Sequence, residues 1–132
     1  MSIGGTKFAL KKTARKKSPV SFYFFEEIKN NILGRDYELS LMLIGSKLSK
    51  QINKKYRKNN KPTNVLSFPL DKKNGEIFID LGTSRKESPR FGMSYKNFVI
   101  YLFIHGCLHL KGMDHGSRMD KEEKKLLKKY SS

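Results

Sequence analysis

All three histidines of this chain lie within one segment of eleven residues, from His105 to His115. His105 and His109 are four residues apart, so on a helix they share one face and their ring nitrogens can converge. Gly112 permits a tight backbone turn after that helix, which can bring His115 back toward the other two rings. The segment therefore requires a helix followed by a reversal. It predicts that His105, His109 and His115 bind one divalent metal ion.

The number of ligands indicates a catalytic rather than a structural metal centre. Structural zinc sites usually have four protein ligands, often cysteines, whereas catalytic sites have three and keep one position for water or substrate. The single cysteine, Cys107, follows His105 by two residues and so points away from the histidine face of a helix. We expect Cys107 to be a small buried apolar residue. A structural metal and histidines that bind no metal are the alternative interpretations.

The residue after the first histidine argues against a peptidase. In the zinc-protease pattern His-Glu-x-x-His, the glutamate is the general base, and here that position is Gly106. The one carboxylate within the segment is Asp114. It either orients a ligand imidazole from outside the ligand set or is an exposed turn residue. The segment thus resembles a protease metal scaffold without its base, which indicates a different substrate.

Charge gives the second constraint on function. The chain has 132 residues, with 28 Lys and Arg against 12 Asp and Glu, and a formal net charge of +16. Such an excess favours polyanionic partners, nucleic acid above all, although some lysines could serve solubility alone. No apolar stretch approaches the roughly 20 residues that cross a bilayer, and no secretory signal is evident. With one cysteine and no disulfide framework, we expect a cytoplasmic protein without a membrane partner.

The order of expected elements predicts one α/β or α+β domain with a small mixed sheet. Pro69 should end one strand, and Asn74-Gly75 should form a hairpin-type turn before the next. Residues 59–64 are expected to be a turn and residues 82–92 a surface loop. The basic residues 1–20 are either a mobile arm or a first strand with a linker, ahead of a core at 21–130. Helices are expected at 21–33, 45–57, 94–110 and 117–130, and strands at 37–44, 65–68 and 76–81.

Three segments together resemble a known family. The segment His105-Gly-Cys-Leu-His-Leu-Lys-Gly-Met-Asp-His115 resembles the signature of the YbeY family, single-strand-specific metallo-endoribonucleases that act in ribosomal RNA maturation. Upstream, Tyr56-Arg57 with Lys61-Pro-Thr-Asn-Val-Leu-Ser-Phe-Pro69 is a second match, and Gly75-Glu-Ile-Phe-Ile79 is a third. The resemblance covers about residues 35–130, whereas the first 20 residues do not resemble the family's usual start.

The resemblance implies a fold and an activity. The expected fold is a single domain, residues 1–132, with a central mixed sheet of about four strands flanked by helices. The expected cofactor is one zinc ion per chain, with no nucleotide cofactor. The expected activity is cleavage of single-stranded RNA in maturation of the 3′ end of 16S ribosomal RNA and in ribosome quality control. The ribosome or its proteins would be partners.

The resemblance also implies site residues beyond the metal ligands. Arg57 takes the position of the family's functional arginine, and His115 is expected to act in catalysis as well as in metal binding. A guanidinium binds phosphate through two hydrogen bonds and stays charged, so Arg57 could stabilise a phosphodiester; the alternative is an exposed end of a lysine-rich helix. Asn64 and Ser67 are expected to line the cleft, and RNA is expected to meet a general Lys/Arg surface.

Two other functions remain as alternatives. A non-catalytic ribosome assembly or RNA-binding factor would use the zinc only to fasten the C-terminal helix and its loop. A metallopeptidase would cleave peptides and not RNA, and Gly106 disfavours it.

Overall fold

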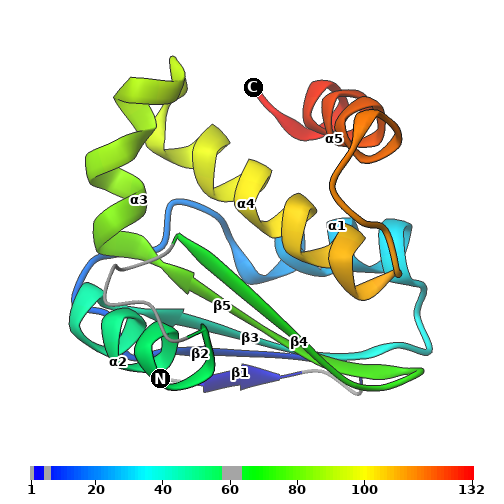
Figure 1. Cartoon of the computed structure of the whole chain (residues 1–132), viewed down its shortest axis with the longest axis horizontal. Coiled ribbons are helices and arrows are strands. Elements are labelled where there is room, and N and C mark those ends of the chain that lie inside the picture. Colours follow the sequence, from blue (N-terminus) through cyan, green and yellow to red (C-terminus); the bar gives the residue numbers. More distant parts are fainter. Residues whose placement is uncertain (1, 5–6, 58–63) are drawn as a thin grey trace.

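The computed structural model describes residues 2–4, 7–57 and 64–132 (Figure 1). The turn expected at 59–64 lies mostly outside the described residues. In chain order the elements are β1 (Ser2–Gly4), β2 (Phe8–Lys12), α1 (Phe22–Leu33), β3 (Glu38–Ile44), α2 (Ser46–Arg57), β4 (Val65–Asp71), β5 (Asn74–Asp80), α3 (Leu81–Glu87), the 3-10 helix η1 (Ser88–Phe91), α4 (Tyr95–Leu110) and α5 (Ser117–Tyr130).

The sheet is mixed, with the strand order β1-β2-β3-β5-β4. Strands β2, β3 and β5 are parallel to one another, while β1 and β4 run antiparallel to their neighbours. The α/β class with a small mixed sheet flanked by helices is confirmed. The described sheet has one strand more than the four we expected, because residues before position 13 supply both β1 and β2.

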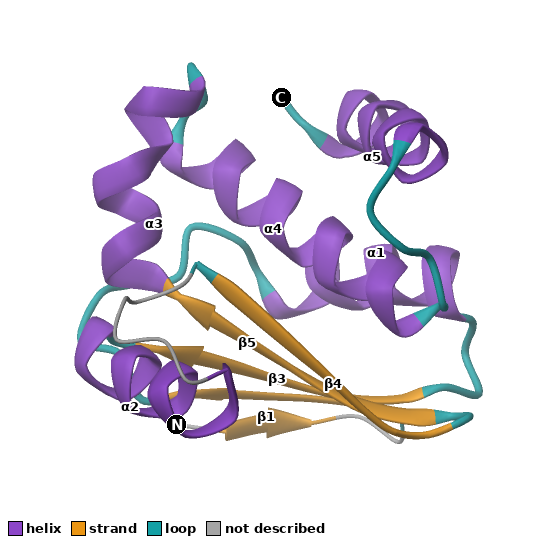
Figure 2. Cartoon of the chain, viewed as in Figure 1, coloured by secondary structure: helices purple, strands orange, loops and turns teal. Residues whose placement is uncertain are grey.

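The two faces of the sheet meet different helices (Figure 2). Along β5, Ile77 and Ile79 are fully buried beneath α4, while Glu76 and Phe78 alternate to the other face, beside α2. Helix α4 is apolar nearly all round, which is typical of a helix buried in a core. It begins after Ser94, whose Oγ accepts a hydrogen bond from the Asn97 backbone N–H at 3.1 Å.

The expectation for residues 82–92 was wrong, because they form α3 and η1 rather than a surface loop. Asp80 is buried and caps α3, with its Oδ1 accepting from the Thr83 backbone N–H at 2.9 Å. Ser84 is also buried, and its hydroxyl donates to the Asp80 carbonyl at 2.6 Å. Because these buried polar groups bond to one another, the helix needs no apolar face, and its sequence shows no apolar periodicity.

The boundaries of the hairpin also differ from the expectation. Strand β4 does not end before Pro69 but continues to Asp71, with an irregularity in pairing between Pro69 and Asp71. Proline is tolerated there because β4 is an edge strand of the sheet. The turn itself lies at residues 72–73, where Asp71 Oδ1 accepts from the Lys73 backbone N–H at 2.9 Å. Asn74 and Gly75 already pair with β3.

Of the two expectations for the N-terminal residues, the strand is right. Phe8 and Leu10 of β2 are buried, and β2 pairs in parallel with β3. The hydrophobic core therefore begins at Phe8 rather than at residue 21. Within the described parts of the chain, no helix is both long and apolar enough to cross a membrane.

Candidate metal centre

The last turn of α4 and the loop after it form the predicted reversal. Gly112 has a φ of +104°, a region that favours glycine. Its backbone N–H donates to the His109 carbonyl at 3.0 Å, and the Met113 N–H donates to the Leu108 carbonyl at 3.0 Å. These bonds close the helix end and turn the chain back, so His115 returns to the face of α4 that bears His105 and His109.

The three imidazoles converge on one point. Their ligand nitrogens all lie within 4.8 Å of one another, and Nε2 of His105 is 3.1 Å from Nε2 of His109. Two nitrogens bound to one tetrahedral zinc ion, each at about 2.0–2.1 Å, would be about 3.3 Å apart. The geometry of this donor set therefore fits a single metal ion. Within the described residues the cluster offers three protein ligands, which leaves a coordination position for water or substrate.

Glu123 fixes the orientation of His105. Its Oε2 lies 2.9 Å from Nδ1 of His105, and its side chain is only 7% exposed. A carboxylate in this position holds the ring proton on Nδ1 and leaves Nε2 as the metal ligand. Burial raises the pKa of the Tyr101 hydroxyl, and the nearby Glu123 carboxylate raises it further.

Sequence reasoning missed Glu123, because it is one of many charged residues in the helix expected at 117–130. The available signal was its register on α5. Glu123 follows Met119 by one turn and shares the buried stripe of Leu126 and Tyr130. A carboxylate within an apolar stripe needs a partner.

The electrostatics of the centre favour a neutral ring at His109. Burial lowers the pKa of His109, and the nearby imidazoles of His105 and His115 lower it further. A hydrogen bond with the Met113 backbone acts in the opposite direction. Neutral imidazole is the form that binds metal, so this crowding prepares His109 as a ligand.

An open cleft of about 520 Å³ lies beside the histidines, with Val65–Pro69 of β4 as its opposite wall. Ser67 lines this cleft, and its hydroxyl donates to the Gly106 carbonyl at 3.3 Å. A Cβ at Gly106 would lie 3.0 Å from both Ser67 Oγ and Ile77 Cδ1. Helix α4 therefore packs so closely on β4 and β5 that a side chain at the position of a protease's glutamate would have to displace these neighbours.

The other candidate residues are less closely associated with the centre. Asn64 precedes β4, and its carbonyl accepts from the Asp80 N–H at 2.9 Å, but it does not line the histidine cleft. Its side-chain Oδ1 is buried without a hydrogen bond among the described residues. Asp114 is exposed. Arg57 is the last residue of α2, and its side chain lies outside what the structure describes, so its role stays a prediction.

Fold and centre together define an α/β protein with three histidines placed to hold one metal ion. A family model described as Endoribonuclease YbeY matches residues 8–131. The chain belongs to the YbeY family.

Several curated proteins with the name Endoribonuclease YbeY are similar to this chain. The protein of Persephonella marina is 37% identical over 105 residues, covering 74% of this chain and 68% of the relative. That of Ehrlichia canis is 44% identical over 87 residues, covering 62% and 56%. That of Clostridium botulinum strain Hall is 36% identical over 132 residues, covering 80% and 76%.

One solved structure has the same fold. The solution structure of TM1509 from Thermotoga maritima superposes with a TM-score of 0.66 at 23% sequence identity, covering 92% of this chain and 88% of that one.

Proposed function

We propose that this chain is a zinc-dependent, single-domain endoribonuclease that cleaves single-stranded RNA in the cytoplasm. Its biological role would be maturation of the 3′ end of 16S ribosomal RNA and ribosome quality control, with the ribosome or ribosomal proteins as partners. The main support is the convergence of His105, His109 and His115 beside an open cleft. Membership of a family described as Endoribonuclease YbeY and a net charge of +16 support RNA as the substrate.

Each residue of the centre has a distinct task in this proposal. His105, His109 and His115 would hold the zinc ion, which supplies Lewis acidity and activates water when bound. Glu123 keeps the proton of His105 on Nδ1, so that the opposite nitrogen stays available. His115 is exposed while the other two rings are half-buried, which makes it the ligand on the substrate side. For this reason we assign His115 a contact with the reacting phosphodiester as well.

Arg57 is proposed to neutralise charge on the phosphodiester. A guanidinium remains protonated at any physiological pH and bonds two phosphate oxygens at once. It gains strength as the phosphorus centre takes on negative charge in the transition state. Ser67 would shape the cleft around this reaction rather than take part in it, and Asn64 and Asp114 would support the site from outside the cleft lining.

The test combines metal analysis with cleavage of matched single-stranded and duplex RNA. Wild-type protein should contain one zinc ion and should cleave the single strand alone, and His109→Ala should lose both properties. Arg57→Ala should retain its zinc and lose about 10²- to 10³-fold in rate. Arg90→Ala is the matched control, because Arg90 is exposed on η1, outside the cleft lining. If Arg57→Ala folds normally and cleaves at the wild-type rate, the proposed role of Arg57 is wrong.

One observation favours a second candidate, a non-catalytic assembly factor. His115 lies in the loop between α4 and α5 and Glu123 lies on α5, so a bound ion would fasten α5 to α4. This candidate predicts that zinc-loaded wild-type protein binds RNA without cleaving it. It also predicts that a chelator unfolds the chain.

A further inference from the structure

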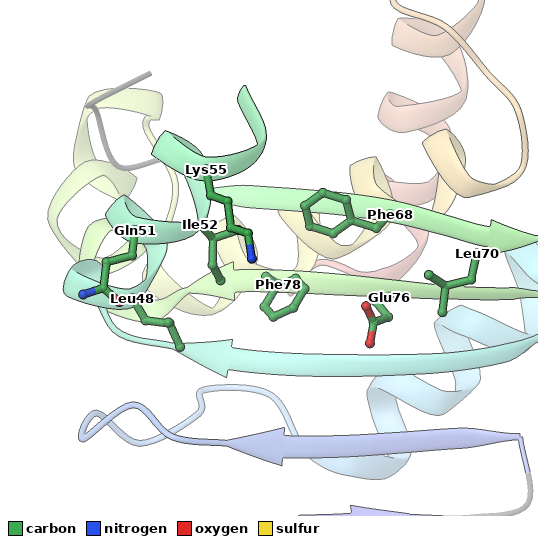
Figure 3. Close-up of a pocket in the computed structure, with 8 residues that line it drawn as sticks. All are labelled: Leu48, Gln51, Ile52, Lys55, Phe68, Leu70, Glu76 and Phe78. Atoms are coloured by element: carbon green, nitrogen blue, oxygen red, sulfur yellow. The ribbon is translucent and has the colours of Figure 1, made fainter. Parts of the chain in front are cut away.

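A second cavity lies on the face of the sheet opposite α4, between α2 and strands β4 and β5 (Figure 3). Its volume is about 450 Å³. We call it the α2 groove and define it by Gln51, Ile52 and Lys55 of α2 with Phe68, Glu76 and Phe78 of the strands. In Figure 3 Ile52 and Lys55 point from the helix toward Phe68 and Phe78 of the strands, and Gln51 and Glu76 lie at opposite ends of the groove. The groove has no part in holding the metal ion.

The floor of the α2 groove is aromatic and aliphatic. Phe68 and Phe78 meet edge to face, with ring centroids 5.7 Å apart and an interplanar angle of 80°. Both rings are half-buried, and Ile52 approaches from the helix side. An apolar floor with two half-buried aromatic rings fits a planar aromatic ligand that stacks on one ring and meets the other at its edge.

The rim of the α2 groove is polar and is surrounded by positive charge. Glu76 offers acceptors at one end of the groove, where they can bond the donors on the polar edge of a planar ring, and Gln51 offers a donor and acceptors at the other end. Lys55 lies at the same rim, and Lys47, Lys50 and Lys54 line an adjoining hollow on α2. This charge favours a ligand attached to phosphates over an apolar protein segment.

The α2 groove adjoins the histidine cleft. Phe68 lines both cavities, and β4, which carries it, is the edge strand of the sheet. No further strand covers β4 within the described residues. An extended polyanion that crosses this edge can therefore contact both cavities.

We infer that the α2 groove is a nucleobase-binding subsite for single-stranded RNA. One base stacks on the ring of Phe78 and meets Phe68 at its edge, and Glu76 accepts hydrogen bonds from the polar edge of the base. The lysines of α2 neutralise the adjacent phosphates, while the strand continues over β4 to the histidine centre. The inference rests on the proposed function, since it assigns a place to a nucleotide next to the cleavage site. It also explains how a basic protein would prefer single strands, because bases paired in a duplex cannot enter the groove.

Binding, rather than cleavage, tests the subsite. Fluorescence anisotropy compares a labelled single-stranded oligoribonucleotide with an abasic chain of equal length, on ice, with a gel to verify that the RNA is intact. Wild-type protein should bind the base-bearing chain more tightly. Phe78→Leu should weaken that binding by about 5- to 100-fold and leave the abasic chain unaffected. Phe91→Leu is the matched control, because Phe91 is 51% exposed and lies on η1, outside the groove.

A second variant guards against a folding defect in Phe78→Leu. Glu76→Gln keeps the size and shape of the side chain, so it should fold normally, and because an amide donates as well as accepts it should change the preference among the four homopolymers. The subsite is overturned if Phe78→Leu binds the base-bearing chain as tightly as wild type does. The groove would then be a site for an apolar protein segment instead. It is also overturned if wild type binds both chains equally. If wild type binds RNA through its bases but does not cleave it, the proposed nuclease activity is wrong and the subsite is supported. If wild type cleaves RNA and Phe78→Leu binds the base-bearing chain as tightly as wild type does, the nuclease activity is supported and the subsite is wrong.

Discussion

Glu123 on α5 and His105 on α4 are 18 residues apart in the chain and meet at 2.9 Å. The carboxylate is buried, so it needs a partner, and the imidazole needs an acceptor to keep its proton on Nδ1. One contact meets both needs. It also links the helix that carries two proposed ligands to the helix that follows the third.

Glu123→Gln should weaken zinc binding by about 10- to 100-fold. The amide can still accept a hydrogen bond from Nδ1, but it lacks the negative charge that increases the basicity of the ligand ring. Competition with a chromophoric chelator measures the zinc affinity directly. Glu122→Gln is the matched control, because Glu122 neighbours Glu123 and does not line the histidine cleft. Equal zinc affinity in Glu123→Gln and wild type would contradict the positioning role.

Gly106→Glu would create the zinc-protease pattern His-Glu-x-x-His, and we expect it to destabilise the fold without producing a peptidase. The new side chain would collide with Ser67 and Ile77, which lie 3.0 Å from the site of its Cβ. Overpacking costs about 1–3 kcal/mol, and burial of a carboxylate adds to it. Urea denaturation measures the free energy of unfolding, and a fluorogenic peptide reports peptidase activity.

Gly106→Ala is the control for that substitution. Removing a glycine from a helix interior gains about 1 kcal/mol, which opposes the smaller clash of a single methyl group. We therefore expect Gly106→Ala to stay within about 1 kcal/mol of wild type. A Gly106→Glu protein as stable as wild type would show that α4 can move away from β4 and β5.

The parts of the site that sequence could predict are those set by local spacing. His105, His109 and the turn at Gly112 lie within a few residues of one another, so helix geometry alone brings them together. Helix α4 was expected at 94–110 and is found at Tyr95–Leu110, because Ser94 is a strong N-cap signal.

The parts that sequence could not predict depend on contacts between distant segments. Asp80 caps α3 only because it is buried at the end of β5, so a polar stretch became a helix where a loop was expected. In the sequence Glu123 is one of many charged residues of α5, and only the packing of α5 against α4 distinguishes it from the others. The α2 groove joins Phe68 and Phe78 of the sheet to Lys55 of α2, which no periodicity in the chain indicates.

Lys29 gives a prediction about pH and stability. The residue is fully buried in α1, and its Nζ donates to Asn30 Oδ1 and to the Arg35 carbonyl, both at 3.2 Å. Burial lowers its pKa below the ordinary value of 10.5, and Glu26 acts in the opposite direction. Between the lowered pKa and 10.5 the unfolded chain binds more protons than the folded chain, so the contribution of Lys29 to stability rises with pH.

Lys29→Met removes this titration. The free energy of unfolding of wild type, relative to that of Lys29→Met, should increase from neutral pH toward pH 10, as measured by urea denaturation at several pH values. Lys16→Met changes an exposed position, so its free energy of unfolding should vary with pH in the same way as that of wild type over this range. Parallel curves for wild type and Lys29→Met would mean that the ammonium group is hydrated in the folded protein.

RNA binding should depend steeply on salt, because the net charge of +16 acts through release of counterions from phosphates. If four phosphates of a single strand are neutralised, the affinity should fall about 50-fold between 50 and 200 mM salt, from a slope of about −0.7 per phosphate. Fluorescence anisotropy over that range measures the slope.

Replacing Lys50 and Lys54 of α2 by alanine should reduce the magnitude of this salt slope by about 1.4, which corresponds to two lost phosphate contacts, if the RNA backbone lies along α2. An affinity that changes less than about twofold would contradict the electrostatic account of binding. A normal slope that these replacements leave unchanged would place the RNA backbone on another basic surface.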